Sequence, residues 1–289
     1  MENDFNPNEM TFGFIGLGLI GGSMAKALRS KYKDCTIIAY NRSEMPRTMA
    51  LNDGTADIAT NIIDESFGKC DFIFLCTPVE FNEQYLEILS KLIKHDCIIT
   101  DVGSVKGNIH HAAKAAGLEQ NFIGGHPMAG SEKTGYENSC AALCQGSVYP
   151  VTPTCRTDKN ALDRYIFILE AIGFKPVIMS YEAHDAAAAA ISHLPHLAAA
   201  QLVLLAKDNE DENMYMKKLA STGFKDTTRI AASSADVWQQ ICITNRDNIS
   251  EMLSQYIGGL EKIKAALDNK DEQFIYNLFT ESKKYRDTF

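Results

Sequence analysis

Short apolar runs alternate with longer stretches of helical periodicity through the first part of the chain. Runs that are apolar at successive positions are typical of strands buried on both faces, as in parallel sheets. Their alternation with helical stretches predicts a mostly parallel sheet covered by helices on both faces. The predicted strands span residues 11–15, 36–40, 71–76, 97–101, 122–124, 147–152 and 175–179, and the clearest helices span 19–30, 81–92, 108–116 and 159–172.

The pattern changes after Met179, where the strand signals stop. Residues 181–289 carry only helical periodicity, with predicted turns near Asn209, at 222–223 and at 268–270. Such a change of class marks a domain boundary, which we place near Ser180. The sequence therefore predicts an α/β N-terminal domain over residues 1–180 and an all-α C-terminal domain over residues 181–289.

Composition narrows the class of protein. Of the 289 residues, 45% are apolar and 22% charged, which is ordinary for a globular protein. The net charge of -9 would be repelled by phosphate backbones, so we expect no nucleic-acid partner. The eight cysteines lie singly, without a CxxC pair, and residues 1–10 lack the segments of a signal peptide. We therefore expect the cysteines to be reduced thiols and the protein to be cytoplasmic.

One stretch, residues 186–206, has the length and low charge of a membrane span. It contains Ser192, His193, Pro195 and His196, and two imidazoles beside a helix-breaking proline would be costly in lipid. We therefore expect no membrane partner, and we interpret the stretch as a buried helix of a soluble protein.

A glycine-rich turn follows the first predicted strand directly. Residues 16–21 read Gly-Leu-Gly-Leu-Ile-Gly and open the next predicted helix. This spacing supplies glycine for a tight turn, for close approach of the backbone to a pyrophosphate and for packing of helix on strand. The helix that follows offers free N–H groups and the positive end of its dipole to phosphates. The context predicts a Rossmann-type dinucleotide-binding domain.

The end of the second strand bears on the choice of nicotinamide cofactor. An NAD site usually has an acidic residue there for the ribose 2′-hydroxyl, whereas this chain has Asn41, Arg42 and Ser43. A guanidinium and a hydroxyl suit a 2′-phosphate, so the sequence favours NADP over NAD, unless Arg42 stacks on the adenine or faces solvent. The expected cofactor-binding residues are Gly16, Gly18, Leu19, Ile20, Gly21, Asn41, Arg42, Ser43, Thr77, Asp101 and Gly103.

Two later loops leave the carboxyl ends of predicted strands, where open α/β sheets bind ligands. They span residues 100–106 and 124–132. His126 lies among glycines and beside a proline, a poor setting for a core residue, and imidazole is the natural base near neutral pH. We expect His126 to act as a general base and Ser104 to hold its tautomer by a hydrogen bond.

At these residues the chain resembles the prephenate dehydrogenase family of tyrosine biosynthesis. The resemblance covers most of the chain and rests on six elements in the order of the family: residues 16–21, 101–106, 125–132, 192–196, 223–229 and Trp238. It implies that His126 is the catalytic histidine and Ser104 the serine that assists it. It further implies that His196 and Arg229 hold the carboxylates of the substrate, with Lys225, Ser192 and Glu132 at the periphery of the pocket.

The resemblance implies oxidative decarboxylation of prephenate, a small dicarboxylate, to 4-hydroxyphenylpyruvate with hydride transfer to NAD or NADP. A dianion entering an acidic protein needs local cations, and Lys225 and Arg229 would lie on one face of a helix. The high apolar content of residues 181–289 exceeds what a small helical domain can bury alone, notably at 186–206 and 249–263. We therefore expect a homodimer formed through the helical domain.

Three alternatives remain open from the sequence. Arogenate dehydrogenase acts on a substrate with an amino group in place of the side-chain keto group. A β-hydroxyacid dehydrogenase shares the glycine turn and the Asn-Arg-Ser segment but relies on a lysine of the helical domain. A metal-binding or cofactor-sensing protein would use residues such as His126, His193, His196, Cys140 and Cys144, but these are scattered along the chain and we expect no metal.

Overall fold

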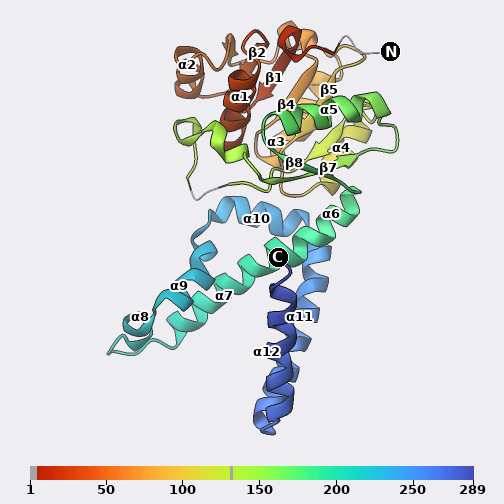
Figure 1. The fold of residues 1–289 in the computed structure, drawn as a ribbon. Helices are drawn as coiled ribbons and strands as arrows, with labels where there is room; N and C mark the ends of the chain where they lie inside the picture. The colour runs from red at the N-terminus through yellow and green to blue at the C-terminus, as the bar shows by residue number, and fades with distance from the viewer. Residues whose placement is uncertain (1–4, 131–132) are drawn as a thin grey trace.

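The chain folds into an α/β domain followed by a helical domain (Figure 1). The structure is a computed structural model that describes residues 5–130 and 133–289, apart from the side chains of residues 79 and 80. The predicted order, an α/β N-terminal Rossmann-type domain and then an all-α domain, is confirmed. The last strand ends at Ile178 and the first long helix of the second domain starts at Tyr181.

Five parallel strands form the main sheet in the order β3-β2-β1-β4-β5. The chain reverses its direction of travel between β1 and β4, which creates the crevice where such sheets bind nucleotides. The strands are β1 Thr11–Ile15, β2 Thr36–Tyr40, β3 Ile58–Thr60, β4 Phe72–Leu75 and β5 Ile98–Asp101. The helices are α1 Leu19–Lys31, α2 Glu44–Asn52, α3 Val79–Leu89, α4 Gly107–Ala115 and α5 Lys159–Ala171.

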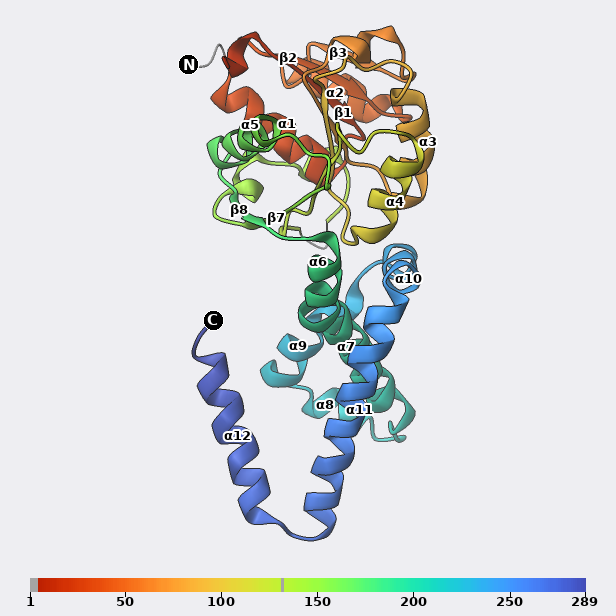
Figure 2. The same ribbon diagram turned by 90° about the vertical axis from the view of Figure 1, so that its right-hand side faces the viewer.

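Both faces of this sheet are buried, which explains the continuous apolar runs. Phe14 and Phe74 stack with ring centroids 4.9 Å apart in the cluster that also holds α1 and α5. Ile15 and Leu75, one residue later on the same strands, face the cluster formed with α3 and α4. Figure 2 shows these helix pairs on opposite sides of the sheet. Successive side chains of a strand point to opposite faces, so each strand contributes to both cores.

The expectation of one mostly parallel sheet is wrong for the end of the domain. Strands β6 Ile123–Gly125, β7 Val148–Pro153 and β8 Lys175–Ile178 form a second sheet, in which β6 and β7 run antiparallel. A single parallel bridge between Ile99 and Phe122 joins the two sheets. The sequence also missed β3, because three residues are too short for a period-two pattern.

The helical domain begins with one long helix that runs from Tyr181 to Asp208. It comprises α6 Tyr181–Ala188, a π-helical turn Ala189–His193 and α7 Leu194–Asp208. The π turn lies directly before Pro195, whose missing N–H cannot continue the α-helical ladder. The other helices are α8 Tyr215–Leu219, α9 Thr222–Thr228, α10 Ala235–Thr244, α11 Arg246–Asp268 and α12 Glu272–Arg286. The turn predicted at 222–223 lies slightly earlier, at 220–221.

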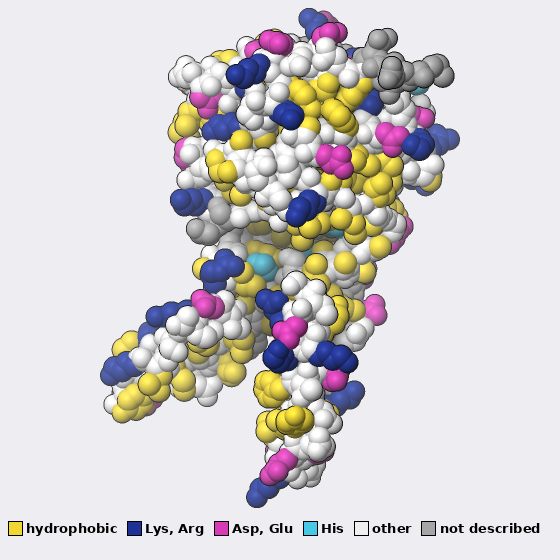
Figure 3. Space-filling model, in the orientation of Figure 1, with side chains coloured by type: hydrophobic (Ala, Val, Ile, Leu, Met, Phe, Trp, Pro, Cys, Tyr) yellow, Lys and Arg dark blue, Asp and Glu magenta, His cyan; other side chains and the backbone are white. Residues whose placement is uncertain are grey.

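The long helix is not buried within the single chain, contrary to the sequence-based interpretation. By length and composition it could cross a membrane, and only 22% of its apolar window is buried. Leu204 and Leu205 remain 47% and 55% exposed. In Figures 1 and 3, α7 to α9 and the α11–α12 hairpin extend from the α/β domain as two diverging arms with apolar surface along them. The two hydrophobic core clusters found among the described residues both lie in the α/β domain and do not reach this surface.

Candidate active site

The glycine turn lies between β1 and α1 and fits a pyrophosphate. Gly16 has φ +105°, and a Cβ there would meet the Cys76 backbone at 2.8 Å. A Cβ on Gly21 would meet the Gly16 carbonyl oxygen at 2.2 Å, whereas a Cβ on Gly18 would meet nothing within 4 Å. Gly18 is the N-cap of α1 and provides no side-chain cap, so the first N–H groups of the helix are available to an anion.

The turn after β2 and the glycine turn border one cavity of about 200 Å³. Asn41 accepts a hydrogen bond from the Leu17 amide at 3.1 Å, and Arg47 donates to the Asn41 and Arg42 carbonyls. The Arg42 guanidinium lies over the Phe81 ring, 4.8 Å from its centroid. Ser43 caps α2 without a side-chain hydrogen bond. Arg42 and Ser43 therefore present a cation and a hydroxyl at the edge of this cavity.

The expected cofactor residues are brought together only in part. Gly16, Gly18, Asn41, Arg42, Ser43 and Thr77 line the cavity by the glycine turn. Gly103 lines an adjoining cavity of about 160 Å³ with Thr77 and Ser104. Leu19, Ile20 and Gly21 form the first turn of α1. Asp101 is fully buried, and its carboxylate accepts from the Gly103 and Gly125 amides and from Lys106, so it holds both loops in place.

The Asp101–Lys106 ion pair is buried completely beneath the candidate catalytic loop. Lys106 also donates to the Gly125 carbonyl oxygen at 2.7 Å, one residue before His126. Burial lowers the pKa of Lys106, and the neighbouring carboxylates of Asp101 and Asp185 oppose this shift. A buried ion pair needs further hydrogen bonds, which here come from the Gly125 carbonyl to Lys106 and from the Gly103 and Gly125 amides to Asp101. The buried ion pair therefore holds the loop that carries His126 through the Gly125 carbonyl.

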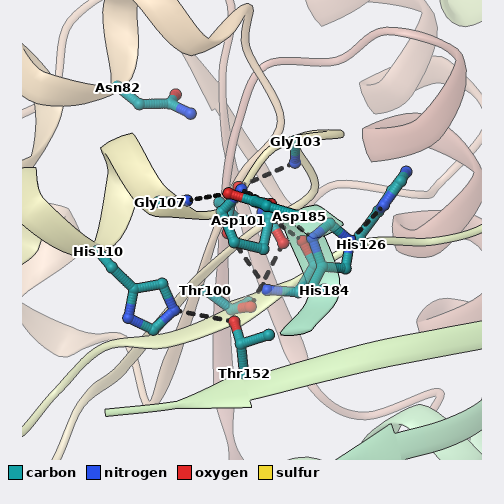
Figure 4. Close-up of polar contacts among 12 residues, drawn as sticks. Asn82, Thr100, Asp101, Gly103, Gly107, His110, His126, Thr152, His184 and Asp185 are labelled. Atoms are coloured by element: carbon teal, nitrogen blue, oxygen red, sulfur yellow. Dashed lines mark hydrogen bonds and ion pairs between the residues drawn. The ribbon is translucent and has the colours of Figure 1, made fainter. Parts of the chain in front are cut away.

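His126 follows β6 directly, and its Nδ1 lies 2.9 Å from Nε2 of His184 on α6. His184 Nδ1 donates to the Asp185 carboxylate at 2.8 Å, because a carboxylate only accepts. In a neutral His184 the other nitrogen, Nε2, must then accept from His126 Nδ1–H. This leaves Nε2 of His126 with its lone pair. The sequence assigned this orienting role to Ser104, but the structure gives it to His184 (Figure 4).

Asp185 connects α6 to α4 as well as to His184. Its two carboxylate oxygens accept from the Lys106 and Gly107 amides at 2.8 Å each, at the start of α4. Burial alone would raise the pKa of Asp185, but the hydrogen bonds from His184 and the two amides lower it below its usual value. Burial lowers the pKa of His126 well below its ordinary value, and Lys106 and His184 add to this effect. The imidazole of His126 is thus neutral at pH 7.

A central cavity of about 700 Å³ lies between the two domains. Ser104 and His126 line it from the α/β domain, and Ser192, His193, His196, Arg229 and Trp238 line it from the helical domain. His196 stacks on Trp238 with centroids 3.6 Å apart and donates from Nδ1 to the Ser192 carbonyl oxygen. Lys225 lies on exposed α9 outside this lining, and Glu132 lies outside the described residues.

Sequence reasoning missed His184, Asp185 and Asn245, and it gave His193 no role in the expected site. The available signal was the His-Asp pair at 184–185 in an alanine-rich helix, because titratable residues in an apolar element need buried partners. Across the part of the chain that the structure describes, no group of three or more His, Cys, Asp or Glu is placed to hold a metal ion. Cys140 is the N-cap and Cys144 the last residue of a short 3₁₀ turn, so the two do not lie on an α-helix.

Comparisons with known proteins agree along almost the whole chain. A family model described as "Prephenate dehydrogenase, nucleotide-binding domain" matches residues 24–178, and one described as "Prephenate dehydrogenase, dimerization domain" matches residues 180–281. A curated relative, prephenate dehydrogenase of Bacillus subtilis strain 168, is 35% identical over 98% of this chain and 76% of its own length.

Solved structures of two related dehydrogenases are similar to this chain over nearly its whole length. Prephenate dehydrogenase from A. aeolicus, in complex with hydroxyphenyl propionate and NAD+, matches with a TM-score of 0.91 and 31% identity over 98% of this chain and 99% of its own. The arogenate dehydrogenase of Synechocystis matches with a TM-score of 0.87 and 30% identity over 96% of this chain and 99% of its own.

Proposed function

This chain belongs to the prephenate dehydrogenase family, and on that premise we propose that it catalyses the oxidative decarboxylation of prephenate to 4-hydroxyphenylpyruvate, with NAD(P) as hydride acceptor. The observation that carries the proposal is the position of His126, which is hydrogen-bonded through Nδ1 to His184 and lines the cavity between the two domains. The β-hydroxyacid alternative lacks comparable support, because its lysine base has no counterpart among the described residues that line this cavity.

His126 supplies the acid–base chemistry in this mechanism. Its Nε2 accepts the proton of the ring hydroxyl as hydride leaves the same carbon. When bound, the nicotinamide ring provides the hydride acceptor. The imidazolium that forms keeps its Nδ1–H directed to His184, and the Asp185 carboxylate beyond offsets the new charge. Loss of carbon dioxide then aromatises the ring, so positioning and one proton transfer suffice. Ser104 lines the same cavity and is proposed to contact the substrate hydroxyl beside His126.

Arg229 is the proposed anchor for the carboxylates of the substrate. It lines the cavity opposite the His126 loop, and a guanidinium binds a carboxylate through two parallel hydrogen bonds. Such a local cation is needed because the protein carries a net charge of -9. We keep Ser192, Lys225 and Glu132 as peripheral contacts, of which Ser192 lines the cavity.

For the cofactor, we propose that NADP is used at least as well as NAD. Arg42 and Ser43 border the cavity by the glycine turn, and the residues after β2 offer no carboxylate that would repel a 2′-phosphate before Glu44. The NAD+ complex of the A. aeolicus relative supports a nicotinamide dinucleotide in general. The free first turn of α1 and the open space at Gly18 fit its pyrophosphate.

Arogenate is a second candidate substrate, favoured by the tautomer of His196. Because Nδ1 of His196 donates to the Ser192 carbonyl, a neutral His196 has a lone pair on Nε2. Burial lowers the pKa of His196, and Arg229 adds to the effect, which maintains this neutral form. A lone pair suits the ammonium group of arogenate, whereas a carboxylate at this position would require His196 to take up a proton.

One assay tests these proposals directly. Purified protein is given prephenate or arogenate with NAD or NADP, and the absorbance of the reduced nicotinamide is followed. We expect turnover of prephenate with both cofactors. Absence of turnover with either substrate would refute the proposed function, and turnover of arogenate alone would replace prephenate by the second candidate.

We further propose that the domains divide at Ser180, into residues 1–180 for the dinucleotide and 181–289 for substrate binding and dimerisation. The nucleotide-binding model ends at residue 178 and the dimerization model begins at residue 180, which supports the division and a homodimer through the helical domain. Largely exposed apolar side chains along the long helix also support the homodimer. Cytoplasmic localisation is consistent with such a biosynthetic role.

A further inference from the structure

His193 is a buried histidine that lines the central cavity and has one unsatisfied nitrogen. Its side chain is 1% exposed and contributes to the cavity lining. Its Nε2 is buried and has no hydrogen-bond partner among the described residues. Buried polar groups in folded proteins are nearly always paired, so an orphan at a ligand cavity calls for a partner from the ligand. The proposed mechanism gives His193 no role so far.

The surroundings of His193 fix which of its nitrogens carries the proton. Asn245, the N-cap of α11, has its Nδ2 3.1 Å from His193 Nδ1. Two further hydrogen bonds fix which end of this amide is Nδ2. Nδ2 donates to the Asp185 carbonyl oxygen at 2.8 Å, and Oδ1 accepts from Asn248 at 2.7 Å. Nδ2 is a donor only, so Nδ1 of His193 accepts. In the neutral ring the proton is therefore on Nε2.

The ring is also held as a neutral group in one orientation. Burial lowers the pKa of His193 to about 4, against a smaller opposite effect of Asp185. Its ring packs edge-on against Trp238 with centroids 6.0 Å apart, and Trp238 lines the same cavity. His193 thus offers a fixed N–H donor without a positive charge. This suits a position near His126, because a cation there would oppose proton uptake by the base.

We propose that His193 is a substrate-binding residue whose Nε2–H donates a hydrogen bond to an oxygen atom of the bound dicarboxylate. The inference rests on the proposed function, since it takes the substrate of that reaction as the ligand of the central cavity. His193 complements its two neighbours in the lining: neutral His126 and His196 have lone pairs on Nε2, whereas His193 has the proton. His193 is thus the donor among the three histidines of the lining.

The tautomer is tested by ¹⁵N NMR of the histidine side chains at pH 7, with the His193 signals assigned by their loss in His193→Gln. We expect a protonated Nε2 and an unprotonated Nδ1 in the free protein. Addition of the product 4-hydroxyphenylpyruvate should shift the Nε2 signal. A proton on Nδ1, or a Nε2 signal unaffected by saturating product, would overturn the proposal.

The donor is tested by two substitutions with opposite consequences. His193→Phe keeps an aromatic ring against Trp238 but removes the donor, and His193→Gln supplies an amide N–H near the position of Nε2. We expect kcat/KM for prephenate to fall about 10- to 100-fold in His193→Phe and to stay within about threefold of the parent in His193→Gln. The affinity for NAD(P) should change little. His193→Phe should lower the thermal unfolding midpoint, because it leaves one N–H of buried Asn245 without its acceptor, so the kinetics are measured well below that midpoint. His111→Phe, on the exposed side of α4, is the matched control.

Equal losses in both variants, or parental kinetics in His193→Phe, would overturn the proposal. Failure of the proposed function is recognised separately, since the parent would then oxidise neither prephenate nor arogenate. An active parent with an equally active His193→Phe variant refutes the His193 donor alone.

Discussion

At the scale of single residues, His126 should dominate the chemistry. His126→Asn removes the base, so we expect kcat to fall by several orders of magnitude while cofactor affinity stays nearly unchanged, because the proton is taken only in the transition state. Steady-state kinetics and cofactor titration measure the two effects. The exposed His111→Asn serves as control. A fall of less than about tenfold would mean that another group acts as the base.

The same residue predicts the pH dependence. Burial holds the pKa of His126 below its ordinary value, and the unprotonated form is the active one. Activity is therefore fully present at neutral pH and is lost only as the pH falls through this lowered pKa. We expect the acidic limb of kcat/KM to lie below about pH 6.5, the ordinary value for histidine. An acidic limb above that value in the pH profile would contradict the neutral, buried state of His126.

Arg229 should act on binding more than on turnover. Arg229→Ala removes the charged fork proposed for a carboxylate, and we expect KM for prephenate to rise about 10- to 100-fold with a smaller change in kcat. Arg156→Ala, an exposed arginine of the α/β domain, is the matched control. An unchanged KM in Arg229→Ala would show that the substrate carboxylates are held elsewhere.

Arg42 should discriminate between the two cofactors. Its guanidinium is proposed to bind the 2′-phosphate with charge-assisted hydrogen bonds, so Arg42→Ala should weaken NADP about 10- to 100-fold and NAD by less than about threefold. Arg47→Ala is an informative contrast, since Arg47 binds the backbone of the turn and its loss should weaken both cofactors. Equal losses of NAD and NADP in Arg42→Ala, or tighter NAD binding by the parent, would reject the preference.

At the scale of elements, α6 couples the two domains through Asp185. Its carboxylate accepts from two amides at the start of α4 and orients His184. An amide cannot accept from all three donors, so Asp185→Asn leaves a buried donor unsatisfied. We expect a loss of about 1–3 kcal/mol in the free energy of unfolding, together with a lower kcat.

Denaturant titration and kinetics measure these two effects of Asp185→Asn. Asp163→Asn is the matched control, because Asp163 forms an exposed ion pair with Lys159 that contributes little to stability. Parental stability and parental kcat in Asp185→Asn would show that α6 does not orient the base.

At the scale of the whole molecule, the exposed arms of the helical domain predict self-association. Leu205 on α7 is 55% exposed, and Tyr276 and Phe279 on α12 are each 69% exposed. We expect a homodimer at micromolar concentration and at least a tenfold weaker dimer for Leu205→Asp, because a charge would be buried in the interface. Analytical ultracentrifugation measures both. Leu51→Asp on α2, 44% exposed in the other domain, should leave the dimer intact. A monomeric parent would reject the homodimer.

Several features followed from the sequence by itself because they depend on neighbouring residues. The turn at 16–21 needs glycine at closely spaced positions, and strands buried on both faces favour apolar side chains at successive positions. Local sequence patterns likewise predicted that His126 lies in a loop after a strand and that the α/β domain precedes a helical one. The division into two sheets did not follow, since apolar periodicity reports burial and not the strand with which a segment pairs.

The partners of the candidate site were decided only by the tertiary structure. His126 meets His184 across 58 positions of sequence, Lys106 meets Asp185 across 79, and Asn245 meets His193 across 52. A sequence pattern shows that a buried polar residue needs a partner, but the partner is chosen by how the elements pack. The proton positions on His126 and His193 depend on those partners. The residues capable of the chemistry are therefore readable from the sequence, whereas the tautomers in which they act are set by the fold.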